Sequence, residues 1–143
     1  MQLIYHIASL QDVERAGRSG HYAPATLQSE GFIHCSYAGQ VEAVANRYFH
    51  GQQYLALLEI DPQRVPARIV DENLLGGREL YPHLYGPLPM SAVTAIRELP
   101  RRQDGSLDLP CNIRADTLIL PYTLLAVRTA PSKTGSDPKQ DNE

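Results

Sequence analysis

The sequence predicts an α+β fold in which a compact mixed sheet carries two short helices near the N-terminus. A length of 143 residues is enough for one domain with a substantial core. A hydrophobic share of 43% and a charged share of 20% are typical of a soluble globular protein. Strand-like segments are interrupted by two early helical segments and joined by short connections, which favours a compact sheet over a doubly wound one.

The first predicted elements are a strand at residues 2–8 and a short helix directly after it. Apolar side chains occupy both faces of the strand. Ser9 stands at the N-cap position of the helix, and Asp12 three residues later gives a capping-box-like start. Gly17 and Gly20 are expected to end this helix.

A loop is expected at residues 18–30, followed by a second strand at Gly31–Ser36. Alternation would place His34 and Ser36 on the same face of that strand. Ser36 is also a candidate N-cap for the next helix. Apolar residues at i, i+3, i+4 and i+7 spacing predict that helix over residues 38–49.

Three further strands are predicted in the second half of the domain, at residues 54–60, 67–71 and 93–99. The first of these is apolar on both faces, which is typical of a central strand. Three prolines between residues 82 and 89 argue against a helix or a central strand there. We interpret that segment as an irregular wall or lid.

The chain is predicted to divide into one domain and a tail. The domain covers residues 1–99. Residues 100–129 carry enough apolar side chains to form a C-terminal extension that packs on the domain. Residues 130–143 are rich in proline, serine, lysine and aspartate, and we expect them to be disordered.

Charge and composition narrow the possible partners. The net charge of −3, with both signs interspersed, lacks the basic stripe that binding to duplex DNA requires. A small nucleotide or a single RNA end remains open as a substrate. No secretory signal is expected, and the longest apolar run, residues 118–127, is shorter than the ~20 residues of a spanning helix. We therefore expect a cytoplasmic location with no membrane partner.

Histidines in short apolar runs are the main candidates for chemistry. His6, His34 and His83 each lie in such a run, and we expect the three imidazole rings to meet at one pocket. Histidine is the usual acid, base or hydrogen-bond anchor at physiological pH. The alternative for each is a half-buried side chain tied to a backbone carbonyl. Cys35 follows His34 on the opposite strand face, so we interpret it as a small core residue and not as a nucleophile.

Other kinds of site receive weaker support. Three histidines can bind zinc, but none of the close spacings of a metal-binding helix is present, so no metal site is predicted. Glu59 and Glu79 are candidate carboxylates: Glu59 at the solvent rim of a strand, and Glu79 near the pocket. Gly76-Gly77 lacks the pattern of a phosphate-binding loop.

Four segments carry a resemblance to a known family, in order and at fitting spacing between residues 2 and 99. They are Ile4–Ile7, Gly31–Ser36, Val44–Phe49 and Tyr81–Leu88. These segments resemble the bacterial domain-of-unknown-function family 952. That family is similar in fold to the ADP-ribosyltransferases, whose split mixed sheet binds NAD in a cleft. Within that group it is nearest to the histidine-rich branch with the RNA 2′-phosphotransferases, which use NAD to remove a 2′-phosphate from RNA.

The resemblance implies a role for several residues of this sequence. His6 resembles the histidine that holds a ribose hydroxyl of NAD, and Tyr48 resembles the tyrosine that stacks on nicotinamide. His34 and His83 would be the catalytic residues. The side chains implied to bind the cofactor are His6, Ala8, Ser9, Ser36 and Tyr48.

The first functional hypothesis is therefore an NAD-dependent enzyme of the ADP-ribosyl or RNA 2′-phosphotransferase type, with NAD as co-substrate. A second hypothesis is a non-catalytic module on the same fold that binds a nucleotide or another small molecule. A third is a hydrolase in which two histidines act as acid and base on a phosphoester.

Overall fold

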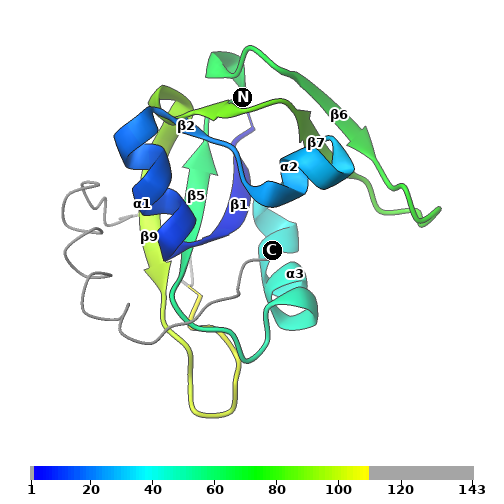
Figure 1. The fold of residues 1–143 in the computed structure, drawn as a ribbon. Helices are drawn as coiled ribbons and strands as arrows, with labels where there is room; N and C mark the ends of the chain where they lie inside the picture. Colours follow the sequence, from blue (N-terminus) through cyan, green and yellow to red (C-terminus); the bar gives the residue numbers. More distant parts are fainter. Residues whose placement is uncertain (1, 110–143) are drawn as a thin grey trace.

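The computed structural model describes residues 2–109, which form a mixed α+β fold with three small antiparallel sheets (Figure 1). The strands are β1 (Ile4–Ser9), β2 (His21–Tyr22), β3 (Ile33–His34), β4 (Ser36–Tyr37), β5 (Leu55–Ile60), β6 (Arg68–Glu72), β7 (Tyr81–Tyr85), β8 (Leu88–Pro89) and β9 (Val93–Leu99). The helices are α1 (Leu10–Ser19), α2 (Ala25–Glu30) and α3 (Val41–Tyr48), with 3-10 turns η1 (Ala38–Gln40), η2 (Pro62–Arg64) and η3 (Met90–Ala92).

The strand order is β4-β1-β5-β9 in the largest sheet, β3-β7-β6 in the second and β2-β8 in the third. All pairings between these named strands are antiparallel, so three antiparallel sheets replace the predicted mixed sheet. The predicted strands near 54–60, 67–71 and 93–99 are confirmed, and β5 is central as expected.

Helix α1 begins and ends on the signals that the sequence carries. The Ser9 hydroxyl accepts a hydrogen bond from the backbone N–H of Asp12 at 3.0 Å, as an N-cap should. Gly20 ends the helix in the left-handed conformation, with φ 92°, and its N–H donates to the carbonyl of Ala16. Gly17 was also expected to end the helix, but it lies inside α1.

The loop predicted at residues 18–30 is wrong, because β2 and α2 lie within that range. Helix α2 has six residues and no fully buried side chain, so it shows no apolar period that a sequence could reveal. Its end is marked by Gly31 at φ 89°, whose N–H donates to the carbonyl of Leu27.

The chain changes sheets at Cys35, inside the segment predicted as one strand. Strand β3 pairs with β7. Strand β4, which is separated from β3 by Cys35 alone, pairs with β1. Ser36 therefore lies in a strand and does not cap a helix. The N-cap position of η1 is Tyr37, whose backbone N–H donates to Oε1 of Gln40 at 2.9 Å. The helix predicted at 38–49 is confirmed as η1 followed by α3.

Strand β7 is the middle strand of the three-stranded sheet, so the prediction of an irregular wall is wrong for residues 82–85. The carbonyl of Pro82 accepts from the N–H of Cys35 at 3.0 Å, which puts the backbone polar atoms of Pro82 on the β3 side. Strand β3 ends at His34, so the sheet needs no hydrogen bond from the nitrogen of Pro82 at this position. Proline is compatible with a strand at such a position.

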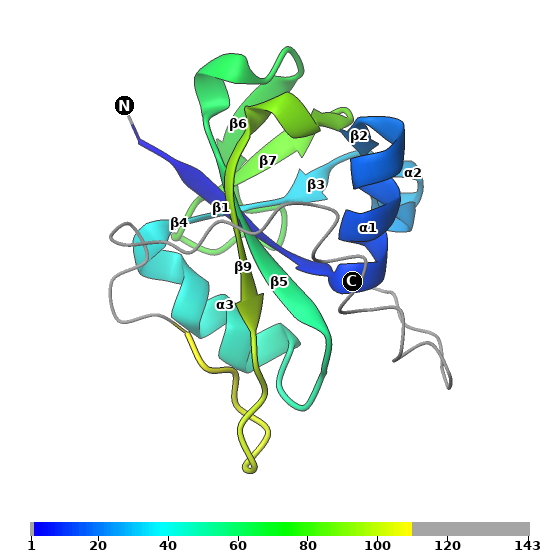
Figure 2. The same ribbon diagram turned by 90° about the vertical axis from the view of Figure 1, so that its left-hand side faces the viewer.

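Two clusters of buried side chains cover the two faces of the four-stranded sheet. Even-numbered residues of β1, such as Ile4 and Ala8, belong to one cluster with α1, and Tyr5 and Ile7 belong to the other with α3. Accordingly, α1 and α3 lie on opposite sides of β1 and β5 (Figure 2).

The predicted tail at residues 130–143 and most of the predicted extension lie outside the described residues. Within the described part of the extension, Arg101 forms an antiparallel bridge with Leu107. Leu107 is buried in the cluster beside α3, and Leu109 packs against it. A search of residues 2–109 for a helix both long and apolar enough to span a bilayer gives none.

We predict that Ser9→Ala lowers the free energy of unfolding by about 1 kcal/mol, because it removes the acceptor that caps α1. Urea unfolding monitored by circular dichroism measures this. The matched control is Ser29→Ala in α2, whose hydroxyl donates to the carbonyl of Thr26 on an exposed surface. An equal loss in both variants would contradict the assignment of Ser9 as the cap.

Candidate functional site

Side chains of the three-stranded sheet alternate between the core and an outer face. In β7, Leu84 points into the core and is fully buried, so Tyr81, His83 and Tyr85 lie on the outer face. Cross-strand neighbours on that face are His34 and Val70 beside His83, Arg68 beside Tyr85, and Glu72 beside Tyr81.

Two of the three predicted histidines meet on this face. The rings of His34 and His83 lie edge to face, with centroids 5.0 Å apart and an angle of 82° between their planes. Phe32 stacks on His83 at 4.2 Å and meets His34 edge-on at 4.7 Å. We call Phe32, His34, Glu72, His83 and Tyr85 the sheet-face cluster.

His83 is held by a carboxylate. Its Nδ1 lies 3.0 Å from Oε2 of Glu72, and the Tyr85 hydroxyl donates to the same oxygen. These two hydrogen bonds hold the pKa of the Glu72 carboxyl below its ordinary value. The bond from Tyr85 has the larger effect, and the bond from His83 has the smaller one. Burial lowers the pKa of His83, against the opposing effect of Glu72. At neutral pH the group is therefore a carboxylate that accepts from a neutral imidazole and a phenol.

His34 forms a second histidine–carboxylate pair beside the first. Its Nε2 lies 2.9 Å from Oε1 of Glu30, at the end of α2, and 59% of its side chain is exposed. The side chain of His83, by contrast, is only 5% exposed. Among the described residues, no hydrogen bond engages Nδ1 of His34 or Nε2 of His83. Each ring thus keeps one nitrogen for another partner.

His6 lies in the interior and does not join the other two rings. Its Nδ1–H donates to the carbonyl of His34 at 2.5 Å, and the Tyr22 hydroxyl donates to its Nε2 at 2.7 Å. Burial lowers the pKa of His6 to about 4. The expectation of one hollow shared by three imidazoles is therefore wrong for His6. The alternative, a histidine tied to a backbone carbonyl, describes its environment.

The other side chains predicted to bind NAD are spread over the fold. Ala8 is buried in the core, Ser9 caps α1, and Ser36 is buried in β4. Tyr48 is exposed at the end of α3, with the Arg47 guanidinium 5.7 Å from its ring centre. Within residues 2–109, none of these four side chains makes a hydrogen bond or ring contact with the sheet-face cluster.

Cys35 is buried, and burial raises the pKa of its thiol to about 12, which leaves it unreactive and confirms its interpretation as a core residue. Glu79 accepts from Nε2 of Gln40 at 3.0 Å beside η1. Glu59 accepts from the hydroxyl of Thr94 at 2.7 Å. No group of three or more potential metal ligands occurs among residues 2–109.

Glu72 and Tyr85 are the functional candidates that the sequence analysis missed. The β6–β7 hairpin pairs Glu72 with Tyr81 and Arg68 with Tyr85, which centres its turn on Gly76-Gly77. Had residues 81–85 been interpreted as a strand, this glycine pair would have set the register. Glu72 would then have been placed next to His83.

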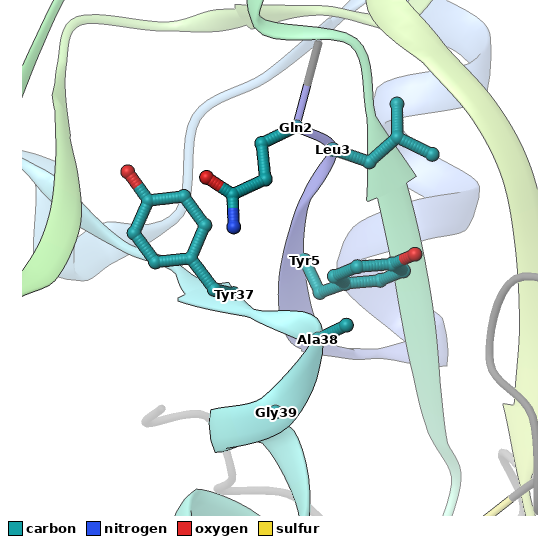
Figure 3. A pocket seen from close by; sticks show the side chains of 6 residues that line it. All are labelled: Gln2, Leu3, Tyr5, Tyr37, Ala38 and Gly39. Atoms are coloured by element: carbon teal, nitrogen blue, oxygen red, sulfur yellow. The ribbon is translucent and has the colours of Figure 1, made fainter.

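Two surface hollows lie away from the cluster. One, with about 300 Å³ of empty space, is lined by Gln2, Leu3, Tyr5, Tyr37, Ala38 and Gly39 (Figure 3). The other is lined by residues at the ends of β5 and β9. Neither hollow is lined by His6, His34 or His83.

The family model described as "Protein of unknown function (DUF952)" matches residues 7–96. A crystal structure of protein CC0527 from Caulobacter crescentus is similar, with a TM-score of 0.68 and 34% identity over 75% of this chain and 94% of that chain. Its solution NMR structure gives a TM-score of 0.65 and 34% identity over 74% and 91%. No curated protein matches the chain.

We predict that the buried His6 makes stability depend on pH. The folded-state pKa of about 4 lies below the ordinary 6.5, so the unfolded chain binds the proton more readily. Stability from this group is full above pH 6.5 and is lost as pH falls toward 4, by about 1.4 kcal/mol per pH unit and about 3 kcal/mol in total.

Urea unfolding at several pH values between 7 and 4 measures that slope. In His6→Gln the slope should fall by the equivalent of about one proton, even if the variant is less stable overall. The control is His21→Gln, an exposed histidine outside the site, which should keep the slope of the native protein. An unchanged slope in His6→Gln would show that His6 titrates as it does in the unfolded chain.

Proposed function

The chain belongs to the family of proteins of unknown function DUF952, and we propose that it is a nucleotide-binding enzyme of the transferase type, with His34 and His83 as its reacting side chains. One observation carries this proposal. An exposed imidazole, His34, lies edge to face with a buried imidazole, His83, that a carboxylate holds in place. Such pairs of titratable groups in different environments suit general acid–base catalysis, which contributes ~10²–10⁴-fold to a rate.

The resemblance to ADP-ribosyltransferase-like proteins makes that fold and an NAD co-substrate part of the proposal. His34 fits a nucleotide, because it is exposed and Nδ1 is open to a ribose hydroxyl or a phosphate oxygen. His6 does not fit the ribose contact in this conformation, since His34 and Tyr22 occupy both of its nitrogens. We therefore propose that the ligand binds at the sheet-face cluster.

A cation beside the cluster supports a phosphate-bearing ligand, including an RNA end. The exposed guanidinium of Arg68 lies 5.2 Å from the ring centre of Tyr85. The aromatic rings of Tyr85 and Phe32, with centroids 5.3 Å apart, connect this cation with His34. A nucleotide presents both an anion and a flat base, which these side chains can bind.

A second candidate function is a binding module without catalysis. The observation in its favour is the burial of His83, because Phe32 covers that ring and leaves His34 as the more accessible imidazole. In that case His34 would anchor the ligand, and His83 would only support His34.

We predict that NAD or ADP-ribose raises the thermal midpoint, since a ligand that binds only the native state stabilises it by about 2.7 kcal/mol at a concentration 100 times Kd. Nicotinamide alone, which lacks the phosphates, should have a smaller effect. If NAD is consumed, His34→Ala should reduce turnover at least ~100-fold while keeping the native fold. His21→Ala, an exposed histidine in β2, is the matched control.

The outcomes separate the hypotheses. A raised midpoint without turnover of NAD supports the binding module. No change of midpoint with any of the three compounds contradicts a nucleotide ligand. Equal turnover by His34→Ala and His21→Ala contradicts His34 as a reacting residue.

A further inference from the structure

We propose that Glu72 is the positioning residue of this site: it holds His83 in the Nδ1–H tautomer, so that Nε2 takes the proton of a hydroxyl-bearing acceptor. The inference rests on the proposed function, because the proton transfer needs a substrate beside His34. It adds the class of acceptor, which is an alcohol such as a sugar hydroxyl, or water. It also gives the two histidine–carboxylate pairs different roles. The His83–Glu72 pair takes up the proton, and the exposed His34–Glu30 pair lies on the side where the proton leaves to solvent.

Glu72 and Phe32 fix the ring of His83 directly, and Tyr85 fixes it through Glu72. Its Nδ1 is 3.0 Å from Glu72, and an ionised carboxylate can only accept, so Nδ1 carries the proton. The Tyr85 hydroxyl donates to the same Glu72 oxygen and thereby holds the carboxylate itself. Phe32 stacks on the ring at 4.2 Å with an angle of 22° between the planes. The tautomer and the orientation of His83 are therefore determined by its neighbours.

Burial keeps the ring of His83 neutral, so that it can accept a proton. Burial, and to a lesser extent His34 on β3, lowers the pKa of His83, while Glu72 on β6 and Glu30 on α2 raise it. Arg68 lies further along the face, over Tyr85, and acts on Glu72. The balance keeps the pKa of His83 below its ordinary value, so the ring is neutral at pH 7.

In the proton transfer to His83, the O–H bond of the acceptor breaks, and its electron pair stays on the oxygen, which becomes the stronger nucleophile. The proton forms the N–H bond at Nε2 of His83. The resulting imidazolium is stabilised by the ionised Glu72 at Nδ1, and the proton later leaves to solvent on the side of the exposed His34.

Glu72→Leu tests the inference by nitrogen-15 NMR of the imidazole rings. Leucine offers no acceptor to Nδ1, so His83 should lose its fixed Nδ1–H and populate the Nε2–H tautomer. Loss of the carboxylate should lower the pKa of His83 further, which moves the acid limb of any turnover to lower pH. Turnover should fall ~10²–10⁴-fold. Glu42→Leu, at an exposed position on α3, is the matched control and should leave all three readouts unchanged.

Two conservative variants separate positioning from folding. Glu72→Asp keeps the carboxylate and should retain the Nδ1–H tautomer, as should Tyr85→Phe, in which Glu72 loses only its second donor. An unchanged Nδ1–H tautomer of His83 in folded Glu72→Leu overturns the inference, and so does its loss in Tyr85→Phe. If the native protein turns over no nucleotide, the proposed function fails, while the tautomers still decide the role of Glu72.

Discussion

The structure depends on one buried imidazole that connects its three sheets. His6 belongs to β1 of the four-stranded sheet, donates to the backbone of His34 in β3, and accepts from Tyr22 in β2. Each partner lies in a different sheet, and His6 is 8% exposed. Replacing this ring removes two hydrogen bonds at once, each of which contributes about 0.5–1.5 kcal/mol to the free energy of unfolding. The imidazole therefore stabilises the arrangement of the sheets.

This connection explains why the reacting side chains lie where they do. The hydrogen bond from His6 holds the backbone of His34 at the point where the chain is about to leave the three-stranded sheet. With its carbonyl turned toward β1, the side chain of His34 extends from the outer face beside His83. The β6–β7 hairpin then brings Glu72 to the other side of His83. One histidine thus supports the position of another without touching its ring.

The sequence carried enough signal for several of the regular elements and for two residues of the site, His34 and His83. Capping at Ser9 and the apolar period of residues 38–49 predicted two helices, because both signals are local. Helix α2 was missed since six residues with no buried side chain show no period. Pro82 concealed a central strand, because only the neighbouring strand end shows that its missing N–H is harmless. The same error hid Glu72, whose place beside His83 follows from the register of that strand.

Chemical-shift mapping of ADP-ribose on the native protein tests most directly whether the outer face of the three-stranded sheet is the binding site. We expect the largest changes at Phe32, His34 and Tyr85, with little change at Ala8 or Tyr48. Changes concentrated at Ala8, Ser9 and Tyr48 would instead place the ligand in the cleft that the family resemblance implies, and would contradict binding at the sheet-face cluster.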